Sequence, residues 1–501
     1  MVKSTVLAFG QGGSSAMAVE YDLVVIGGSA AGLSAAVAAA HLKARVALVE
    51  AHQLGETTFL RRQALIEVGR ATRQAHAAPQ FGVDNLATNV GGVSVSCDRA
   101  MRWAEGVVAT LTENDPQAGS AAALATLGVE VIFGGGQFHN APLCFSVNGR
   151  QLRSRAYLIA TGTYTAKPNQ ELQATGYLTS EDILSSLNFT QSQIPPSLQN
   201  LLVIGGGLVA TELSQTLNRL GSNVTMVVEA PRLLAQEDAT AAQLVQAQLE
   251  AEGVRILTDS RITQAKQLNG KKWVSTGEYT IEASEILLTV GQRPQVESLN
   301  LESVGVQVGK QGVQVNEKLQ TSHPRIYACG EVIGGYPLPH VARYEAAIAL
   351  KNALFFPKFK VNYRAVPWAV FSDPELARVG LTEAQARHRY GQIQVLQQFY
   401  KTIAKSQLRG ETTGFCKMIV FRDGTILGAH LVGSAAAEVV HLIALAMQQR
   451  LKVKALSDLV HISPTFLEIN FKTATEWGLG QQSARQDWLE SWFNLRRAWS
   501  S

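Results

Sequence analysis

Residues 21–50 read YDLVVIGGSAAGLSAAVAAAHLKARVALVE, and this stretch decides the fold. An apolar run, a small-residue turn, an alanine-rich helix and a second apolar run follow one another, which predicts a βαβ unit. Gly27 permits the tight turn, the small Ser29 lets a pyrophosphate approach the backbone at the helix start, and Gly32 lets helix and strand pack closely. Glu50 ends the second strand, where a carboxylate accepts from ribose hydroxyls. The stretch predicts a dinucleotide site, against the alternative of a purely structural βαβ unit, with the candidate contacts Gly27, Gly28, Ser29, Ala31, Gly32 and Glu50.

A second copy of this βαβ pattern begins at residue 201. A strand at 201–204 leads into the turn Gly205-x-Gly207-x-x-Ala210, and a helix at 211–220 and a strand at 224–228 follow. Two such sites in one chain indicate two dinucleotides brought together, usually for hydride transfer. The alternative is a duplicated fold with one inactive site. The candidate contacts are Gly205, Gly207, Leu208, Val209 and Glu229.

Glu229 follows the second strand of this copy and bears on the choice of nicotinamide. A carboxylate there bonds free ribose hydroxyls and repels a 2′-phosphate, so we predict NADH over NADPH. Arg232 stands close by in sequence and would soften the preference.

Composition places the chain among well-cored multidomain proteins. It has 501 residues, 46% hydrophobic and 17% charged, with a net charge of +4 that gives no reason to expect a nucleic-acid partner. No apolar run approaches the length of a membrane span. The cysteines Cys97, Cys144, Cys329 and Cys416 show no paired spacing, which is typical of a reducing cytoplasm and predicts neither a disulfide framework nor a metal site.

Later motifs extend the pattern in a fixed order. They are Ala160-Thr161-Gly162, Glu212, GQRP at 291–294, YACGE at 327–331, and a run from Val366 to Glu383. Together with the two glycine turns, these motifs make the chain resemble the pyridine nucleotide–disulfide oxidoreductases. Within that family it resembles mercuric reductases and dihydrolipoamide dehydrogenases. The resemblance implies FAD in the first site, NAD(P)H in the second, and a homodimer whose partner subunit completes the active site. It adds these cofactor contacts: Ala160, Thr161, Gly162, Arg293, Gly330, Glu331 at the ribityl chain, and Leu338 and Pro339 at a helix start facing the flavin.

The implied fold class is α/β, with two Rossmann-like dinucleotide-binding domains and a C-terminal α+β dimerisation domain. We expect a discontinuous FAD-binding domain at 20–164 and 286–355, an NAD(P)H-binding domain at 165–285, and the dimerisation domain at 360–480. Residues 1–19 are expected to form a disordered leader, and 481–501 an amphipathic helix.

Two departures from the family bear on the chemistry. The helix after Glu50 lacks the family's cysteine pair, and no cysteine precedes Ser96. The family lysine that pairs with Glu212 appears as Gln63, so the carboxylate needs another cation, for which Arg61 and Arg62 are candidates.

The second departure lies near the C-terminus. The family's catalytic histidine is replaced by Ser463, while the glutamate that orients it remains as Glu468. His461 stands two residues earlier and is the candidate base, with a structural histidine as the alternative. The predicted catalytic residues are Glu212, His461 and Glu468.

These features predict an NADH:acceptor oxidoreductase without a redox disulfide, acting on a small-molecule acceptor, of which a quinone is favoured. The alternatives are a nicotinamide transhydrogenase and a nucleotide-binding scaffold protein. The tail carries Leu489, Trp492, Phe493, Arg496 and Arg497 at helical spacing. Such a helix predicts peripheral contact of a cytoplasmic protein with an anionic membrane, against the alternative of packing on the dimer.

Overall fold

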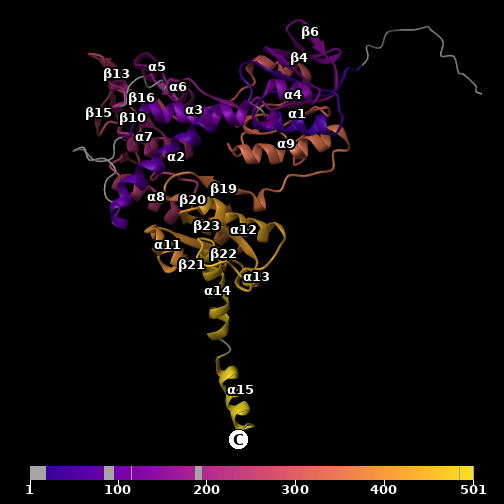
Figure 1. Ribbon diagram of the computed structural model, residues 1–501. Coiled ribbons are helices and arrows are strands. Elements are labelled where there is room, and N and C mark those ends of the chain that lie inside the picture. Colours follow the sequence, from indigo (N-terminus) through magenta and orange to yellow (C-terminus); the bar gives the residue numbers. More distant parts are fainter. Residues whose placement is uncertain (1–18, 84–94, 114, 187–193, 484–485, 500–501) are drawn as a thin grey trace, which may run out of the picture. The chain divides into compact units, whose positions relative to one another are not determined.

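The computed structural model describes residues 19–83, 95–113, 115–186, 194–483 and 486–499, and Figure 1 shows their secondary structure. The predicted leader, apart from Val19, lies outside the described residues. The chain divides into two compact units. The first unit contains the residues up to Glu56, Thr112–Tyr164 and Arg293–Val361. The second contains Thr57–Leu111, Thr165–Gln292 and the residues from Asn362 onward.

A parallel sheet forms the centre of the first unit. Its order is β18-β7-β1-β2-β3, with β18 at Ile326–Ala328, β7 at Ser154–Ile159, β1 at Tyr21–Ile26, β2 at Val46–Glu50 and β3 at Val129–Phe133. Every pairing between neighbours is parallel. Because both faces are covered, β1 reads as a continuous apolar run rather than an alternating one. Leu23 and Val25 enter one core cluster, and Val24 and Ile26 enter another.

Helices cover one face of this sheet and a small antiparallel sheet contributes to the core on the other. Helices α1 (Ala30–His41) and α9 (Pro339–Leu354) lie side by side, as Figure 1 shows. The second core cluster includes aromatic side chains from β4 (Gly136–Asn140) and β5 (Leu143–Val147), which pair antiparallel with each other and with β6 (Arg150–Leu152). The short α4 (Ala121–Thr126) packs beside β3.

The second unit repeats the parallel arrangement. Its sheet has the order β12-β11-β10-β16-β9, with β12 at Arg255–Leu257, β11 at Asn223–Val227, β10 at Asn200–Ile204, β16 at Glu285–Leu288 and β9 at Leu178–Thr179. The predicted repeat of the βαβ device is therefore present as β10, α7 (Leu208–Arg219) and β11. Sequence reasoning missed α8 (Ala239–Ala251) and the antiparallel sheet of β13 (Gln264–Leu268), β14 (Lys271–Ser275) and β15 (Thr280–Ala283).

An antiparallel sheet follows in the C-terminal part of the second unit. Its order is β19-β20-β23-β22-β21, with β19 at Pro367–Val370, β20 at Glu375–Gly380, β23 at Ile426–Gly433, β22 at Phe415–Val420 and β21 at Gln394–Phe399. Helices α12 (Ala436–Gln448) and α14 (Glu468–Ser483) pack on it. The other helices are α5 (Gln170–Thr175), α6 (Ser180–Ser186), α10 (Glu383–Tyr390), α11 (Ala404–Arg409), α13 (Val453–Ser457) and α15 (Gln486–Ala498).

The units divide the chain differently from the domains expected from sequence. Helices α2 (Thr57–Ala77) and α3 (Cys97–Glu113) fall largely in the second unit instead of the FAD-binding part, because Gly69 of α2 faces Thr216 and Arg219 of α7. The expected NAD(P)H-binding and dimerisation segments also share this unit. Buried ion pairs join them, among which Lys417 Nζ lies 2.9 Å from Asp238 Oδ2.

No helix among the described residues is both long and apolar enough to cross a bilayer.

A pair of glycine substitutions tests the packing of α1. A Cβ added at Gly32 would lie 1.8 Å from the Gly27 carbonyl oxygen, whereas one added at Gly106 in α3 would meet nothing within 4 Å. We expect Gly32→Ala to destabilise the protein by about 1–3 kcal/mol, as overpacking does. Gly106→Ala should stabilise it by about 0.5–1 kcal/mol, because alanine favours the helix. Urea unfolding followed by circular dichroism measures both, and equal midpoints for the two variants would contradict the packing argument.

Candidate functional site

Backbone contacts build the first half of the site within the first unit. Gly27 has φ +105°, and a Cβ there would lie 2.3 Å from the carbonyl oxygen of Ala160. The Ala160 N–H donates to the Ile26 carbonyl at 2.7 Å. The β1–α1 turn and the Ala160-Thr161-Gly162 motif are thus brought together, as the sequence predicted them to serve one cofactor. This close, side-chain-free turn fits a dinucleotide, which needs direct access to the backbone.

Glu50 is held at the end of β2. Its Oε2 accepts from the Gly28 N–H at 2.6 Å and its Oε1 from the His52 N–H at 2.9 Å. These bonds fix the carboxylate beside the glycine turn while leaving each oxygen a further lone pair for a ribose hydroxyl.

The helix N-termini leave their first N–H groups without side-chain caps. Within the described part of the chain, neither Ser29 at α1 nor Gly207 at α7 nor Leu338 at α9 makes a side-chain capping bond. By contrast, Asp238 caps α8 and Thr382 caps α10. Free N–H groups at a helix start bind anions, which fits pyrophosphate at α1 and α7 and the electron-rich end of a flavin at α9, where Pro339 is the first residue.

Gly330 and Glu331 lie beside the same turn. A Cβ added at Gly330 would lie 3.3 Å from Ala31 Cβ, and the Gly330 N–H donates to buried Glu345 Oε2 at 2.7 Å. Thr163 Oγ1 donates to Glu331 Oε2 at 2.7 Å. The carboxylate predicted to meet the ribityl chain is thereby oriented by Thr163, a residue that sequence reasoning missed.

An ion pair in the same unit was also missed. Arg343 Nη2 lies 2.6 Å from Glu56 Oε1. Burial raises the pKa of Glu56, Arg343 opposes that increase, and the negative charge of Glu331 adds to it. No spacing in the sequence linked residues 56 and 343, because only the fold brings them together. Arg293, another predicted contact, is exposed on β17 (Gln292–Pro294). The hydrogen bond from the Tyr164 hydroxyl is the main cause that lowers the pKa of Glu297, and the charge of Arg293 adds a smaller effect.

A second dinucleotide-binding turn lies in the second unit. Gly205, Gly207, Leu208 and Val209 form the β10–α7 turn and the first turn of α7. Glu229 follows β11 with an exposed side chain, and Arg261 Nε lies 3.5 Å from its Oε1. The cation that pairs with Glu229 is therefore Arg261, while Arg232 donates to the Ala235 carbonyl.

Glu212 finds its cation on α2. Arg62 Nε lies 3.0 Å from Glu212 Oε2, and both side chains are buried. The Phe371 N–H donates to the other oxygen at 2.8 Å. Burial raises the pKa of Glu212, and the charge of Arg62 is the strongest opposing effect. Of the two candidates named from sequence, Arg62 is thus the partner, and Arg61 pairs with Glu105 at 3.4 Å.

Several polar atoms around this pair lack hydrogen-bond partners. Among the described residues, these include Arg61 Nε, Arg62 Nε, Gln63 Nε2 and Glu212 Oε2. Arg62 and Glu212 are close enough for an ion pair, but their atoms are not aligned for a hydrogen bond. Buried polar groups in native proteins are normally satisfied, so unpaired donors clustered on α2 indicate a place where a ligand or water binds.

Near the C-terminus, Ser463 stands at the position expected for the family's histidine and contacts Glu468. Ser463 Oγ donates to Glu468 Oε1 at 3.1 Å, and the Thr465 N–H donates to the same oxygen at 2.8 Å. His461 instead stacks on Phe471, with ring centroids 4.1 Å apart. The structure therefore brings Glu468 to Ser463 and places His461 against an aromatic ring, and the catalytic role of His461 stays a prediction.

The cysteine side chains are all buried and free. Burial is the main cause that raises the pKa of each thiol, to about 12 for Cys416. Because the thiolate is the reactive form, these residues are poorly suited to redox exchange.

Two dinucleotide-binding sheets, each with a glycine turn and an acidic strand end, define a nicotinamide- and flavin-dependent oxidoreductase. Residues 21–346 match the family described as pyridine nucleotide-disulphide oxidoreductase, and residues 366–474 match its dimerisation domain. The chain belongs to this family, and its cofactors are FAD and NAD(P)H.

Similar proteins include reductases and dehydrogenases of known type. A mercuric reductase of Staphylococcus aureus is 32% identical over 88% of this chain and 79% of its own length. A dihydrolipoyl dehydrogenase of Bacillus subtilis is 30% identical over 89% of this chain and 96% of its own. The solved structure of LpdA from Mycobacterium tuberculosis has a TM-score of 0.80 at 24% identity, covering 91% of this chain and 99% of that one. The flavoprotein disulfide reductase RclA of Escherichia coli, solved as a Cu(II) complex, has a TM-score of 0.77 at 24% identity and the same coverage.

Replacing Arg62 tests the buried ion pair. Arg62→Ala leaves the Glu212 carboxylate buried without its cation, which should cost about 3–5 kcal/mol of unfolding free energy. Arg61→Ala, the control, removes a partner of a largely exposed carboxylate and should cost less than about 1 kcal/mol. Urea unfolding at neutral pH measures both.

The pH dependence of the Arg62→Ala deficit provides a second check. Because the folded-state pKa of Glu212 is raised, the native carboxyl takes up a proton before the unfolded one as the pH falls. The deficit should therefore shrink as the pH approaches the ordinary glutamate value of 4.5. A deficit that does not change with pH would mean that Arg62 acts through packing alone.

Proposed function

We propose that this protein is an NADH-dependent, FAD-containing oxidoreductase that delivers electrons to a quinone without a redox disulfide. FAD, when bound, accepts two electrons from NADH and passes them to the acceptor. A quinone becomes a hydroquinone by taking up two electrons and two protons, so the overall reaction is NADH, a proton and quinone giving NAD⁺ and hydroquinone.

The absence of usable thiols is the observation that carries the proposal. The helix α2 presents Thr57, Thr58 and Phe59 near its start, and no cysteine stands before residue 97 in the sequence. The four thiols that do exist are buried with raised pKa values. Both dinucleotide half-sites nevertheless keep their glycine turns and acidic strand ends. These features support electron transfer from NADH to FAD, and they do not support electron transfer from FAD to a disulfide.

An unpaired donor on α2 favours a carbonyl-bearing acceptor. Gln63 Nε2 is a buried donor without a hydrogen-bond partner among the described residues, and a quinone offers carbonyl oxygens as acceptors. Phe59, whose ring lies 5.4 Å from the Arg62 guanidinium carbon, supplies an aromatic surface on the same helix. Flat aromatic acceptors stack on such rings.

Glu229 supports a preference for NADH. Its carboxylate stands where a 2′-phosphate would otherwise lie and would repel it. Arg261 partly offsets that charge, and both side chains are well exposed, so the preference is one of degree.

The protein is proposed to act as a cytoplasmic homodimer, since residues 366–474 match a dimerisation domain. We extend the proposal to peripheral membrane contact through α15, where lipid quinones are found. Trp488 and Trp492 stack with centroids 6.2 Å apart, and the exposed fractions of Trp488 and Trp499 are 65% and 82%. Aromatic side chains of this kind favour the membrane interface.

An anaerobic titration tests the electron-transfer proposal. Adding NADH should bleach the bound-flavin absorbance without a thiolate-to-flavin charge-transfer band, and NADPH should do so at higher concentration. Reoxidation by a short-chain quinone should follow. The activity should survive replacement of Cys97, Cys144, Cys329 and Cys416 by Ala.

Other outcomes would assign other functions. Bound flavin that NADH cannot reduce would support the nucleotide-binding scaffold. Reduction of NADP⁺ by NADH, with no quinone turnover, would support the transhydrogenase.

A shortened chain tests the role of α15. A protein ending at Ser483 should keep quinone turnover with a water-soluble quinone and should bind vesicles of phosphatidylcholine and phosphatidylglycerol more weakly than the full chain. Undiminished vesicle binding would remove α15 from the membrane proposal.

A further inference from the structure

Cations gather where α9 ends in the first unit. From Ala346 to Val361 the chain carries Lys351, Lys358 and Lys360 and no acidic residue. The acids nearby are engaged, since Asp22 accepts from the Arg45 N–H at 2.9 Å and Glu317 pairs with Lys360 at 2.7 Å. The surface is therefore positive on balance.

Large apolar side chains stand exposed among these cations. Phe356 is 78% exposed and Phe355 is 60% exposed. Leu42, at the end of α1, is also exposed. The ammonium groups of Lys351 and Lys358 lie 5.5 and 5.4 Å from the ring centroid of Phe359. Apolar patches rimmed by polar groups mark interaction sites on soluble proteins.

The loop that carries these phenylalanines is fastened at its base. Buried Asn352 donates to the Phe359 carbonyl at 2.8 Å and accepts from the Phe359 N–H at 3.0 Å. It also donates to the Lys318 carbonyl at 2.9 Å. The Phe355 N–H donates to the Lys351 carbonyl at 3.1 Å. Phe355 and Phe356 are thus displayed by a braced loop and do not fold back onto the core.

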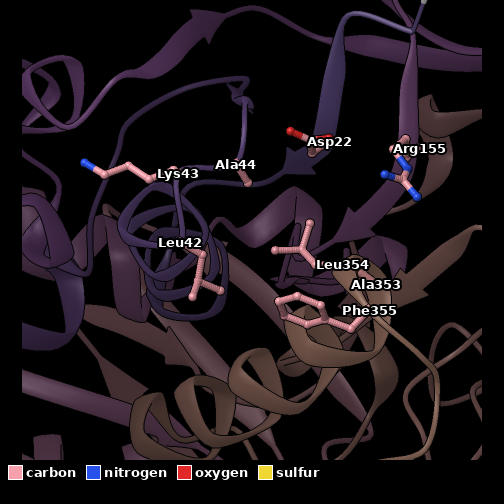
Figure 2. Close-up of a pocket in the computed structure, with 8 residues that line it drawn as sticks. All are labelled: Asp22, Leu42, Lys43, Ala44, Arg155, Ala353, Leu354 and Phe355. Atoms are coloured by element: carbon pink, nitrogen blue, oxygen red, sulfur yellow. The ribbon is translucent and has the colours of Figure 1, made fainter.

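A hollow of about 210 Å³ adjoins the loop. Figure 2 shows Leu42, Leu354 and Phe355 gathered in it, with the ammonium of Lys43 and the guanidinium of Arg155 on opposite sides. The hollow therefore has an apolar floor, and its polar rim carries two cations and the Asp22 carboxylate.

We propose that this basic-aromatic surface, formed by Leu42, Lys43, Arg155, Lys351, Phe355, Phe356 and Lys358, docks on an anionic lipid bilayer. The phenylalanines at the loop tip enter the boundary between headgroups and acyl chains. The cations around them contact the negative headgroups. In an anionic bilayer the negatively charged headgroups lie above the apolar acyl chains. An apolar loop tip with cations around it is complementary to that arrangement.

This inference goes beyond the proposed function and does not depend on it. Docking requires neither bound FAD nor quinone turnover, and it uses residues of the first unit, whereas α15 belongs to the second. Failure of the electron-transfer proposal would leave it unaffected.

Vesicle flotation tests the basic-aromatic surface. The full chain and the chain ending at Ser483 are mixed with vesicles of phosphatidylcholine alone or with phosphatidylglycerol. We expect binding only to the anionic vesicles, reduced by added salt. The Phe355→Ser/Phe356→Ser variant should lose binding in the chain ending at Ser483 and bind more weakly in the full chain, which keeps α15. The Lys43→Gln/Lys351→Gln/Lys358→Gln variant should bind on the order of 100-fold more weakly, at roughly fivefold for each lysine.

A matched control is Phe399→Ser in the second unit. Phe399 is 45% exposed and the Lys401 ammonium lies 5.5 Å from its ring, so it repeats the local chemistry outside the surface. It should bind vesicles like the parent chain. Circular dichroism of each variant confirms folding, and the lysine variant, which removes no apolar contact from the core, keeps the test decisive if the phenylalanine variant misfolds.

Three results would overturn the proposal. One is equal binding to neutral and anionic vesicles, and another is unchanged binding of both variants. The third is concentration-dependent self-association that the phenylalanine variant abolishes while vesicle binding is absent, which would assign the surface to a second copy of the chain.

Discussion

A methyl group at Gly32 would lie 1.8 Å from the carbonyl oxygen of Gly27, and one at Gly27 would lie 2.3 Å from the carbonyl oxygen of Ala160. Helix α1 can therefore pack on β1 and β7 only if these positions lack side chains. This backbone contact fixes where the N-terminus of α1 points and keeps its first N–H groups uncapped. It also brings Glu50, Gly330 and Glu331 around one turn. At the second turn the close approach is at Gly205, where a Cβ would lie 2.4 Å from Thr289 Oγ1, and Ala210 takes the place that Gly32 has in the first turn.

The buried charge on Glu212 is the next constraint. A carboxylate with no exposure must have a cation, and loss of the family lysine at position 63 is answered one residue earlier by Arg62. Arg62 Nε and Glu212 Oε2 lie 3.0 Å apart without forming a hydrogen bond, and Gln63 Nε2 on the same helix also has no hydrogen-bond partner among the described residues.

The cysteines and the residues around Glu468 both bear on the proposal that no thiol takes part in the reaction. Ser463 holds the contact to Glu468 that the family's histidine makes, and each cysteine lies in a buried setting that disfavours its thiolate. Exposed aromatic side chains occur instead in α15 and in the braced loop after α9. In both places cations lie near these aromatic side chains in the sequence.

The sequence by itself determined the two βαβ devices, the acidic strand ends, the missing cysteine pair and the serine at position 463. These follow from local patterns, since strand, glycine turn and helix succeed one another within thirty or so residues. It left Arg61 and Arg62 as equal candidates, because two adjacent residues on a helix point in different directions and only the packing of α2 against α7 selects one. The tertiary structure alone decided that α2 belongs with the second unit, that Thr163 orients Glu331 and that Arg343 pairs with Glu56. Each of these joins residues far apart in the chain, where no spacing rule operates and the fold sets the distance.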